Sequence, residues 1–156
     1  MQPDKGLLRN PIHAFSLGFG SGLMPWAPGT WGTLVAYPFY FLLWPFGIWF
    51  YVVILILLII ASCYACDYTS RALGEHDHKS IVCDEVVGYL LVLLFTPPSL
   101  GWFLFSFLVF RLFDIFKPWP ILWFDQNLKN GTGIVVDDLL AGIYAVLVVY
   151  FFTLLL

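Results

Sequence analysis

Long apolar runs dominate the pattern along the chain, and three short blocks that hold all the charges interrupt them. The uncharged runs cover residues 10–66, 86–110 and 139–156. A helix that crosses a bilayer needs about 20 apolar residues. The pattern therefore predicts an all-α fold, a polytopic membrane helix bundle that forms a single domain over residues 1–156.

Turn signals divide these runs into about five expected membrane segments. Residues 96–99 (TPPS) and 44–47 (WPFG) contain prolines that end a helix and carry no charge. Two segments have full length, two are borderline, and the first is short and contains Pro38. In chain order, the expected segments are 33–44, 47–66, 81–96, 100–116 and 133–156.

Charge sets the expected orientation of these segments. Only 11% of the residues are charged, against about 25% in an ordinary soluble domain. All seven Lys and Arg lie within residues 4–9, 67–85 and 111–138. The positive-inside rule places these blocks in the cytoplasm and, with five segments, the C-terminus outside. No nucleic-acid partner is expected, and the oligomeric state stays open.

A glycine-rich stretch precedes the first expected segment. Residues 18–22 (GFGSG) and 27–33 (APGTWGT) combine glycine, proline and threonine, so we expect irregular backbone rather than a regular helix. Glycine lets backbone N–H groups approach a phosphate closely. The stretch is therefore either a phosphate-binding loop or a bent entry into the first segment, and the sequence favours neither.

Two acidic pairs occur in similar surroundings. Asp84-Glu85 and Asp137-Asp138 each follow two β-branched residues and a spacer, and each precedes a small residue by about one turn. A single acid at a helix start is explained by the helix dipole. Adjacent carboxylates repeated on two helices that could meet are costly unless a cation neutralises them. Oxygen ligands favour a hard cation, Mg²⁺, over zinc or copper.

Cationic residues accompany these acids. Arg111 and Asp114 lie three residues apart on one expected helix face, which a structural ion pair would also explain. Lys117 precedes the helix-ending Pro118 and could merely extend to the interface. With Lys79, these cations suit phosphate recognition. The motif His76-Asp-His78 is a weak zinc alternative. Together the residues indicate chemistry on the phosphorylated headgroup of a lipid.

At these residues the chain resembles the phosphatidylglycerophosphatase A family of bacterial inner-membrane lipid phosphatases. The motifs of the resemblance are 20–23 (GSGL) with 28–32 (PGTWG), 77–88 with its DEVVG, 110–114 (FRLFD) with 117–120 (KPWP), and 133–138 (GIVVDD) with 141–142. The resemblance implies Mg²⁺-dependent hydrolysis of phosphatidylglycerophosphate at the cytoplasmic face. The products would be phosphatidylglycerol, at the last step of its synthesis, and inorganic phosphate.

The roles expected of individual residues follow from this reaction. Asp84, Glu85, Asp137 and Asp138 are expected to hold the metal. The expected catalytic residues are Asp84, Asp114, Asp138 and Arg111. The expected substrate-binding residues are Gly29, Thr30, Lys79, Arg111 and Lys117. Asp77 is expected to orient a neighbouring group from behind the metal ligands.

Other functions stay open from the sequence alone. The enzyme could act on other lipid phosphates, or it could transfer a phospho-alcohol between lipids with paired metals. A membrane transporter is a third alternative, because acids within membranes line ion pathways.

Overall fold

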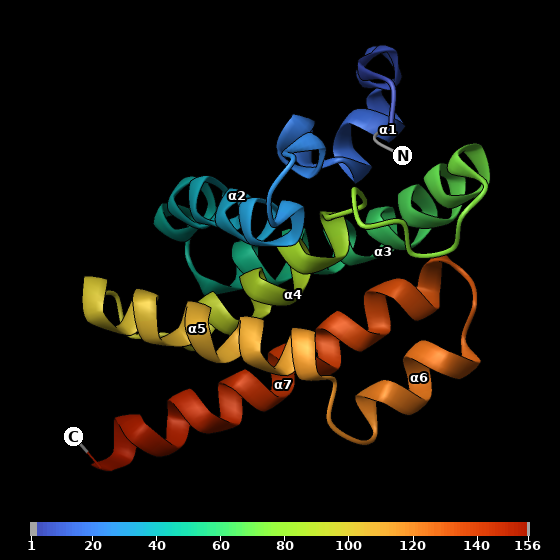
Figure 1. The fold of residues 1–156 in the computed structure, drawn as a ribbon. Helices are drawn as coiled ribbons and strands as arrows, with labels where there is room; N and C mark the ends of the chain where they lie inside the picture. The colour runs from blue at the N-terminus through green and yellow to red at the C-terminus, as the bar shows by residue number, and fades with distance from the viewer. Residues whose placement is uncertain (1–2, 156) are drawn as a thin grey trace.

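The computed structural model describes residues 3–155, and all regular secondary structure in this range is helical (Figure 1). Three 3₁₀ turns and seven α-helices follow one another along the chain. In order, they are η1 Lys5–Arg9, α1 Pro11–Ser16, η2 Gly18–Leu23, α2 Pro28–Leu43, η3 Trp44–Phe46, α3 Ile48–Leu73, α4 Cys83–Leu94, α5 Leu100–Phe116, α6 Ile121–Asn127 and α7 Gly131–Leu155. The prediction of an all-α fold is confirmed.

Two of these helices, α3 and α7, are long and apolar enough to cross a membrane by length and composition. They have 26 and 25 residues. At 1.5 Å per residue each is roughly 38 Å long, more than the hydrocarbon core of about 30 Å. Both overlap segments that the apolar pattern predicts at full length, but α3 continues to Leu73, seven residues beyond the expected end at residue 66.

The outer surface of the bundle is strongly apolar. Along α5, Leu100, Leu104, Leu108 and Leu112 recur every four residues, and each is at least half exposed. Large apolar side chains are also exposed on α3 and α7, among them Trp49 and Phe151. Soluble monomers rarely expose continuous apolar patches of this extent. The surface therefore fits a lipid environment.

Helix α4 is the central element of the fold. Nine of its twelve residues are buried, and it packs against α2, α3, α5 and, most extensively, α7. It is shorter than the expected segment 81–96, because residues 81–82 belong to a loop that is fixed by a hydrogen bond from Val82 N–H to the Ser16 carbonyl (2.9 Å). At roughly 18 Å, α4 is too short to cross a bilayer by itself.

The expectation of irregular backbone was wrong for residues 28–33, which form the start of α2, whereas Ala27 directly before the helix has a positive φ of 46°. Proline is tolerated at the first helical position, where its missing N–H costs no hydrogen bond. Irregular backbone is confined to the preceding segment, where Gly18, Phe19 and Gly20 have positive φ angles. Helix propensity alone predicts the wrong structure for these residues, because packing of α2 against α4 stabilises a helix start that contains glycine.

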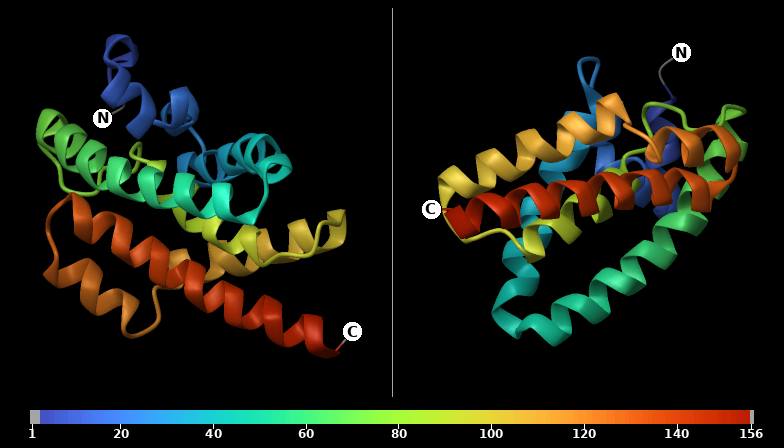
Figure 2. Two further views of the ribbon diagram at one scale, coloured as in Figure 1. Left: turned by 180° about the vertical axis from the view of Figure 1, so that it is seen from behind. Right: turned by 90° about the horizontal axis from the view of Figure 1, so that it is seen from below.

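The elements that carry charge gather at one end of the bundle. The N-terminal turns, the end of α3 and helix α6 lie at the right in Figure 1, whereas the start of α5 and the end of α7 lie at the left. The two views in Figure 2 show the same separation. The uncharged turns at residues 44–47 and 95–99 therefore lie away from the charged loops. This arrangement places the predicted site residues at one end.

Candidate active site

The crossing of α4 and α7 brings the two acidic pairs together. A Cβ atom on Gly88 would lie 2.9 Å from the Asp138 carbonyl oxygen, and one on Gly142 would lie 2.8 Å from that of Gly88. The two helices therefore approach backbone to backbone, as small residues permit. Asp84 begins the first turn of α4, whereas α7 starts at Gly131, so its acids lie in the second turn rather than at the helix start as expected.

A polar cavity of about 340 Å³ opens at this crossing. It contains every predicted site residue except Thr30, which lies half-buried on α2 one residue after the lining Gly29. The lining residues are Ala27, Pro28, Gly29, Asp77, Lys79, Ile81, Asp84, Glu85, Arg111, Asp114, Ile115, Lys117, Asp137 and Asp138. Residues from five separate segments thus meet in one pocket, and their individual roles stay predictions.

Arg111 of α5 is the first of two cations that organise the pocket. Its Nη1 donates to Glu85 Oε1 (3.0 Å), to Asp114 and to Thr33 Oγ1 (3.4 Å). The predicted Arg111–Asp114 pair is therefore present, and Glu85 extends it to a second helix. Sequence reasoning did not assign Thr33 to the site, although it is the last residue of the glycine-rich stretch 27–33 and lies fully buried. Its place in that stretch, directly after Gly32, was the available signal.

The glycines at the start of α2 make room for this cluster. A Cβ atom on Gly29 would lie 2.0 Å from Glu85 Oε1 and 3.0 Å from Arg111 Nη2. One on Gly32 would lie 2.8 Å from Glu85 Oε2. Only glycine permits α2 to pack so close to the carboxylate of α4. These glycines therefore act through close packing as well as through any contact with a ligand.

Lys117, directly after α5, is the second organising cation. Its Nζ donates to Asp125 Oδ1 (2.7 Å) and to Asp137 Oδ2. Burial alone would lower the pKa of Lys117, but the carboxylates of Asp137 and Asp125 outweigh it and raise the pKa above its ordinary value. Sequence reasoning missed Asp125 because α6 folds back beside α7, which no local pattern reveals.

Asp77 reaches the same cluster from the loop before α4. Carboxylate oxygens of Asp77, Asp125 and Asp137 lie within 4.8 Å of one another. Burial of the carboxyl on its pocket side raises the pKa of Asp77, and Lys117 only partly offsets this. The loop residue has a positive φ of 51°, so its backbone is turned sharply at this point. The Lys117 ammonium therefore offsets part of the negative charge of three carboxylates, which come from the loop before α4, from α6 and from α7.

Several buried polar atoms at the pocket have no hydrogen-bond partner within the described part of the chain. They include Asp84 Oδ1, Glu85 Oε2 and Arg111 Nε. An unpaired buried polar atom costs roughly 1–3 kcal/mol, and more when it is charged. The two carboxylate oxygens suit a hard cation, and the guanidinium nitrogen suits an anion. The residues present therefore fit a metal ion together with a phosphate group.

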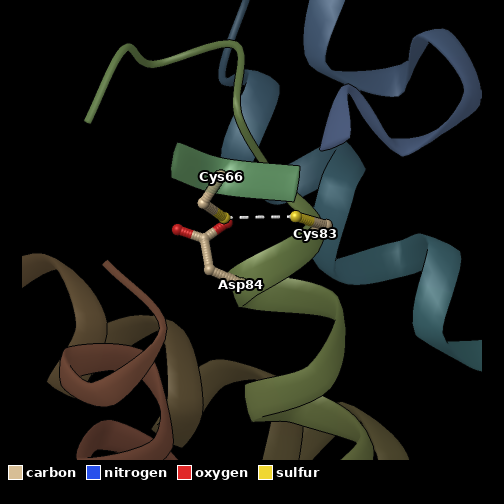
Figure 3. Close-up of side chains that lie close together, drawn as sticks. All are labelled: Cys66, Cys83 and Asp84. Carbon is tan, nitrogen blue, oxygen red and sulfur yellow. Dashed lines mark hydrogen bonds between the residues drawn. The ribbon is translucent and has the colours of Figure 1, made fainter. Parts of the chain in front are cut away.

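Two thiols lie directly behind Asp84. Cys66 of α3 and Cys83 of α4 are buried, and Figure 3 shows their sulfur atoms facing each other beside the Asp84 carboxylate. The histidines of the weak zinc alternative join neither group of three metal-ligand side chains within residues 3–155. A histidine-based zinc site therefore gains no support from the geometry.

The fold and the pocket define a helical protein with two helices long and apolar enough to cross a membrane and with a polar site suited to phosphate groups. The phosphatidylglycerophosphatase A family profile matches residues 14–153. The chain belongs to this family.

Three relatives extend the comparison. The chain is 48% identical over 145 residues to phosphatidylglycerophosphatase A of Haemophilus influenzae, covering 92% of this chain and 89% of the relative. It is 41% identical to phosphatidylglycerophosphatase A of Escherichia coli, covering 92% and 84%. It is 38% identical to a putative phosphatidylinositol-3-phosphatase of Bacteroides thetaiotaomicron, covering 85% and 87%. No solved structure matches the chain.

Proposed function

We propose that this protein hydrolyses the phosphomonoester of phosphatidylglycerophosphate to phosphatidylglycerol and inorganic phosphate. The observation that carries the proposal is the pocket at the α4–α7 crossing, where unpaired oxygens of Asp84 and Glu85 lie beside the Arg111 guanidinium. Two relatives that are 48% and 41% identical carry the name of this activity.

The cofactor that we propose is Mg²⁺, held by Asp84, Glu85, Asp137 and Asp138. Asp84, Glu85 and Asp138 are the better placed ligands, because Asp137 already accepts from Lys117 and from the Asp138 N–H (3.1 Å). A bound Mg²⁺ would draw charge from the phosphoryl oxygens and activate the attacking water. The all-oxygen character of this set supports magnesium over softer metals.

The cations and the start of α2 bind the phosphate in this proposal. Arg111 and Lys117 face the pocket from α5 and its end, and Lys79 faces it from the loop before α4. The first N–H groups of a helix lack partners within the helix and attract anions. Gly29 and Thr30 present such groups at the start of α2, beside the pocket.

The remaining acids position these groups. Asp114 accepts from Arg111, which fixes the guanidinium toward the pocket, and it is near enough to serve as a further metal ligand or as the base that orients the water. Carboxylate oxygens of Asp77 and Asp137 lie within 4.8 Å of each other, and the negative charge of Asp77 helps to hold the Lys117 ammonium in place. Both roles are performed by side-chain carboxylates of this chain.

The proposed location is the bacterial inner membrane, with five membrane segments and the pocket facing the cytoplasm. The segments correspond to α2, α3, α4, α5 and α7, in which the short α4 is surrounded by the other helices rather than by lipid. Support comes from the positive charges, which all lie within residues 4–9, 67–85 and 111–138 and are absent from the turns at residues 44–47 and 95–99. The lipid substrate would then present its phosphate at headgroup depth.

A second candidate is a phosphatase for other lipid phosphates. The 38% identical relative from Bacteroides thetaiotaomicron is named a putative phosphatidylinositol-3-phosphatase. The pocket contacts described above recognise a phosphate group and a metal, and neither feature selects one headgroup.

Phosphate release by the purified protein in detergent micelles tests both candidates. We expect Mg²⁺-dependent release from phosphatidylglycerophosphate that exceeds release from phosphatidylinositol 3-phosphate and phosphatidate, and that EDTA abolishes. Asp84→Asn and Asp138→Asn should lose most of it. Asp67→Asn is the matched control, because Asp67 pairs with the exposed Arg71 outside the pocket.

Each outcome of these assays distinguishes between the candidate functions. Preference for phosphatidylinositol 3-phosphate would support the second candidate. Full activity in both pocket variants would refute the proposed site. Ion flux in liposomes without any phosphate release would favour a transporter.

A further inference from the structure

Two buried thiols that phosphate hydrolysis does not require lie next to Asp84, which is the pocket residue beside them. The Sγ atoms of Cys66 and Cys83 lie 3.3 Å apart, although the residues belong to different helices. Cys66 is fully buried, and Cys83 and Asp84 are 1% and 5% exposed. One potential ligand atom from each of the three residues lies within 4.8 Å of the other two (Figure 3).

We propose that Cys66, Cys83 and Asp84 form a binding site for a thiophilic divalent cation such as Zn²⁺ or Cd²⁺. Two thiolate sulfurs bound tetrahedrally to zinc at about 2.3 Å are separated by roughly 3.8 Å, so the observed spacing needs only a small adjustment. Each thiol gives its proton to water when its sulfur binds the ion. Thiolates select soft or borderline metals, whereas Mg²⁺ prefers oxygen.

The unpaired oxygen of Asp84 supports this site independently of the sulfurs. Asp84 Oδ1 is buried and has no hydrogen-bond partner among the residues that the structure describes. The same side chain lines the polar cavity, so Asp84 lies between the cavity and the two buried thiols. Asp84 therefore connects the sulfur site to the proposed magnesium site.

The sulfur site and the proposed magnesium site share Asp84, so an ion bound at the sulfur site affects the magnesium site. An ion held by the two thiolates and Asp84 removes that carboxylate from the magnesium ligands. An ion bound at the sulfur site should therefore inhibit phosphate hydrolysis, and this expectation rests on the proposed function. Cation binding itself does not depend on that function.

The third cysteine provides a matched control. Cys63 lies three residues before Cys66 on α3 but is only partly buried. It lines a different cavity, together with Asp67 and Thr132. Replacing it should leave the proposed site intact.

Titration of the reduced, detergent-solubilised protein with Cd²⁺ tests the site without any assay of activity. We expect a sulfur-to-cadmium charge-transfer band that saturates at one ion per chain and persists in excess Mg²⁺. Cys63→Ser should retain the band, whereas Cys66→Ser and Cys83→Ser should each weaken it strongly. Circular dichroism confirms that each variant is folded. A wild-type protein without the band, or a band unchanged in both folded variants, would overturn the proposal.

Inhibition by Zn²⁺ is the second readout. Each variant is compared with its own rate in the absence of zinc. Wild type and Cys63→Ser should share one inhibition constant, and Cys66→Ser should need at least tenfold more Zn²⁺. Equal inhibition of all three would refute the link through Asp84. A protein that binds Cd²⁺ but hydrolyses no lipid phosphate would retain the cation site and refute the proposed function.

Discussion

Arg111 is the residue on which most pocket contacts converge. Its guanidinium bonds to Glu85 of α4, to Asp114 of its own helix and to Thr33 of α2, and its Nε has no hydrogen-bond partner in residues 3–155. A planar guanidinium offers five donors in a fixed fork, whereas a lysine ammonium is a single point charge. A positive charge alone therefore does not explain why position 111 is an arginine rather than a lysine.

The first prediction concerns Arg111→Lys. We expect kcat for phosphate release to fall by about a hundredfold, the usual effect of removing one donor that stabilises transition-state charge. Arg71→Lys is the matched control. Arg71 also forms an ion pair within its helix, but its side chain is 79% exposed and lies outside the pocket. Steady-state kinetics measure the effect, and equal rates in both variants would contradict it.

The sequence predicts the identity of most pocket residues but not their partners. Adjacent carboxylates and nearby cations are visible as local motifs, and Arg111–Asp114 lie on one turn of one helix. The partner Thr33 of α2 lies 78 residues from Arg111, and Asp125, although only 8 residues from Lys117, belongs to a separate helix, α6. Such pairs depend on how helices cross, and local patterns contain no information about that.

At the scale of elements, the α4–α7 crossing determines the distance between the acidic pairs. The apolar pattern predicts α5 with the observed bounds, because a proline turn and Pro118 delimit it. It predicts α4 too long, because apolar loop residues and apolar helix residues look alike. The repeated small residues correctly indicate a close helix contact, which Gly88 and Gly142 form.

A second prediction follows for Gly88→Ala. Alanine favours a helix by about 1 kcal/mol over glycine, but its Cβ would lie 2.9 Å from the Asp138 carbonyl oxygen. Overpacking of this kind costs roughly 1–3 kcal/mol, so we expect lower thermal stability and lower activity. Gly101→Ala on α5 is the control, because no atom lies within 4 Å of its added Cβ. Thermal unfolding in detergent measures both, and a stabilised Gly88→Ala would contradict the close contact.

At the scale of the whole molecule, charge and apolar surface are separated along the bundle. The charged loops lie at the pocket end, the uncharged turns lie at the other, and exposed leucines line α5 between them. A bilayer satisfies this distribution, because it solvates the apolar middle while water solvates the charged end. In the proposed orientation the pocket would lie at the depth of lipid headgroups.

The third prediction tests the proposed orientation by labelling of one added cysteine in a Cys63→Ser background, in which the two remaining cysteines, Cys66 and Cys83, are buried. Pro98→Cys in the α4–α5 turn and Gln126→Cys at the end of α6 are both at exposed positions. A membrane-impermeant maleimide should label Pro98→Cys in right-side-out vesicles and Gln126→Cys in inverted ones. Labelling of both from the same side would rule out an odd number of crossings between them.

The sequence by itself determined the helical class and the strongly apolar character of this protein. Apolar run length, charge blocks and acidic pairs are local properties, and they specify helices and predict a membrane environment and an oxygen-rich site without reference to any contact. Only the tertiary structure decided that α4 is a short buried helix, that glycines of α2 make room for Glu85, and that Cys66 meets Cys83 beside Asp84. Those features arise where helices distant in sequence pack closely, so the energy that selects them depends on three-dimensional fit rather than on residue type.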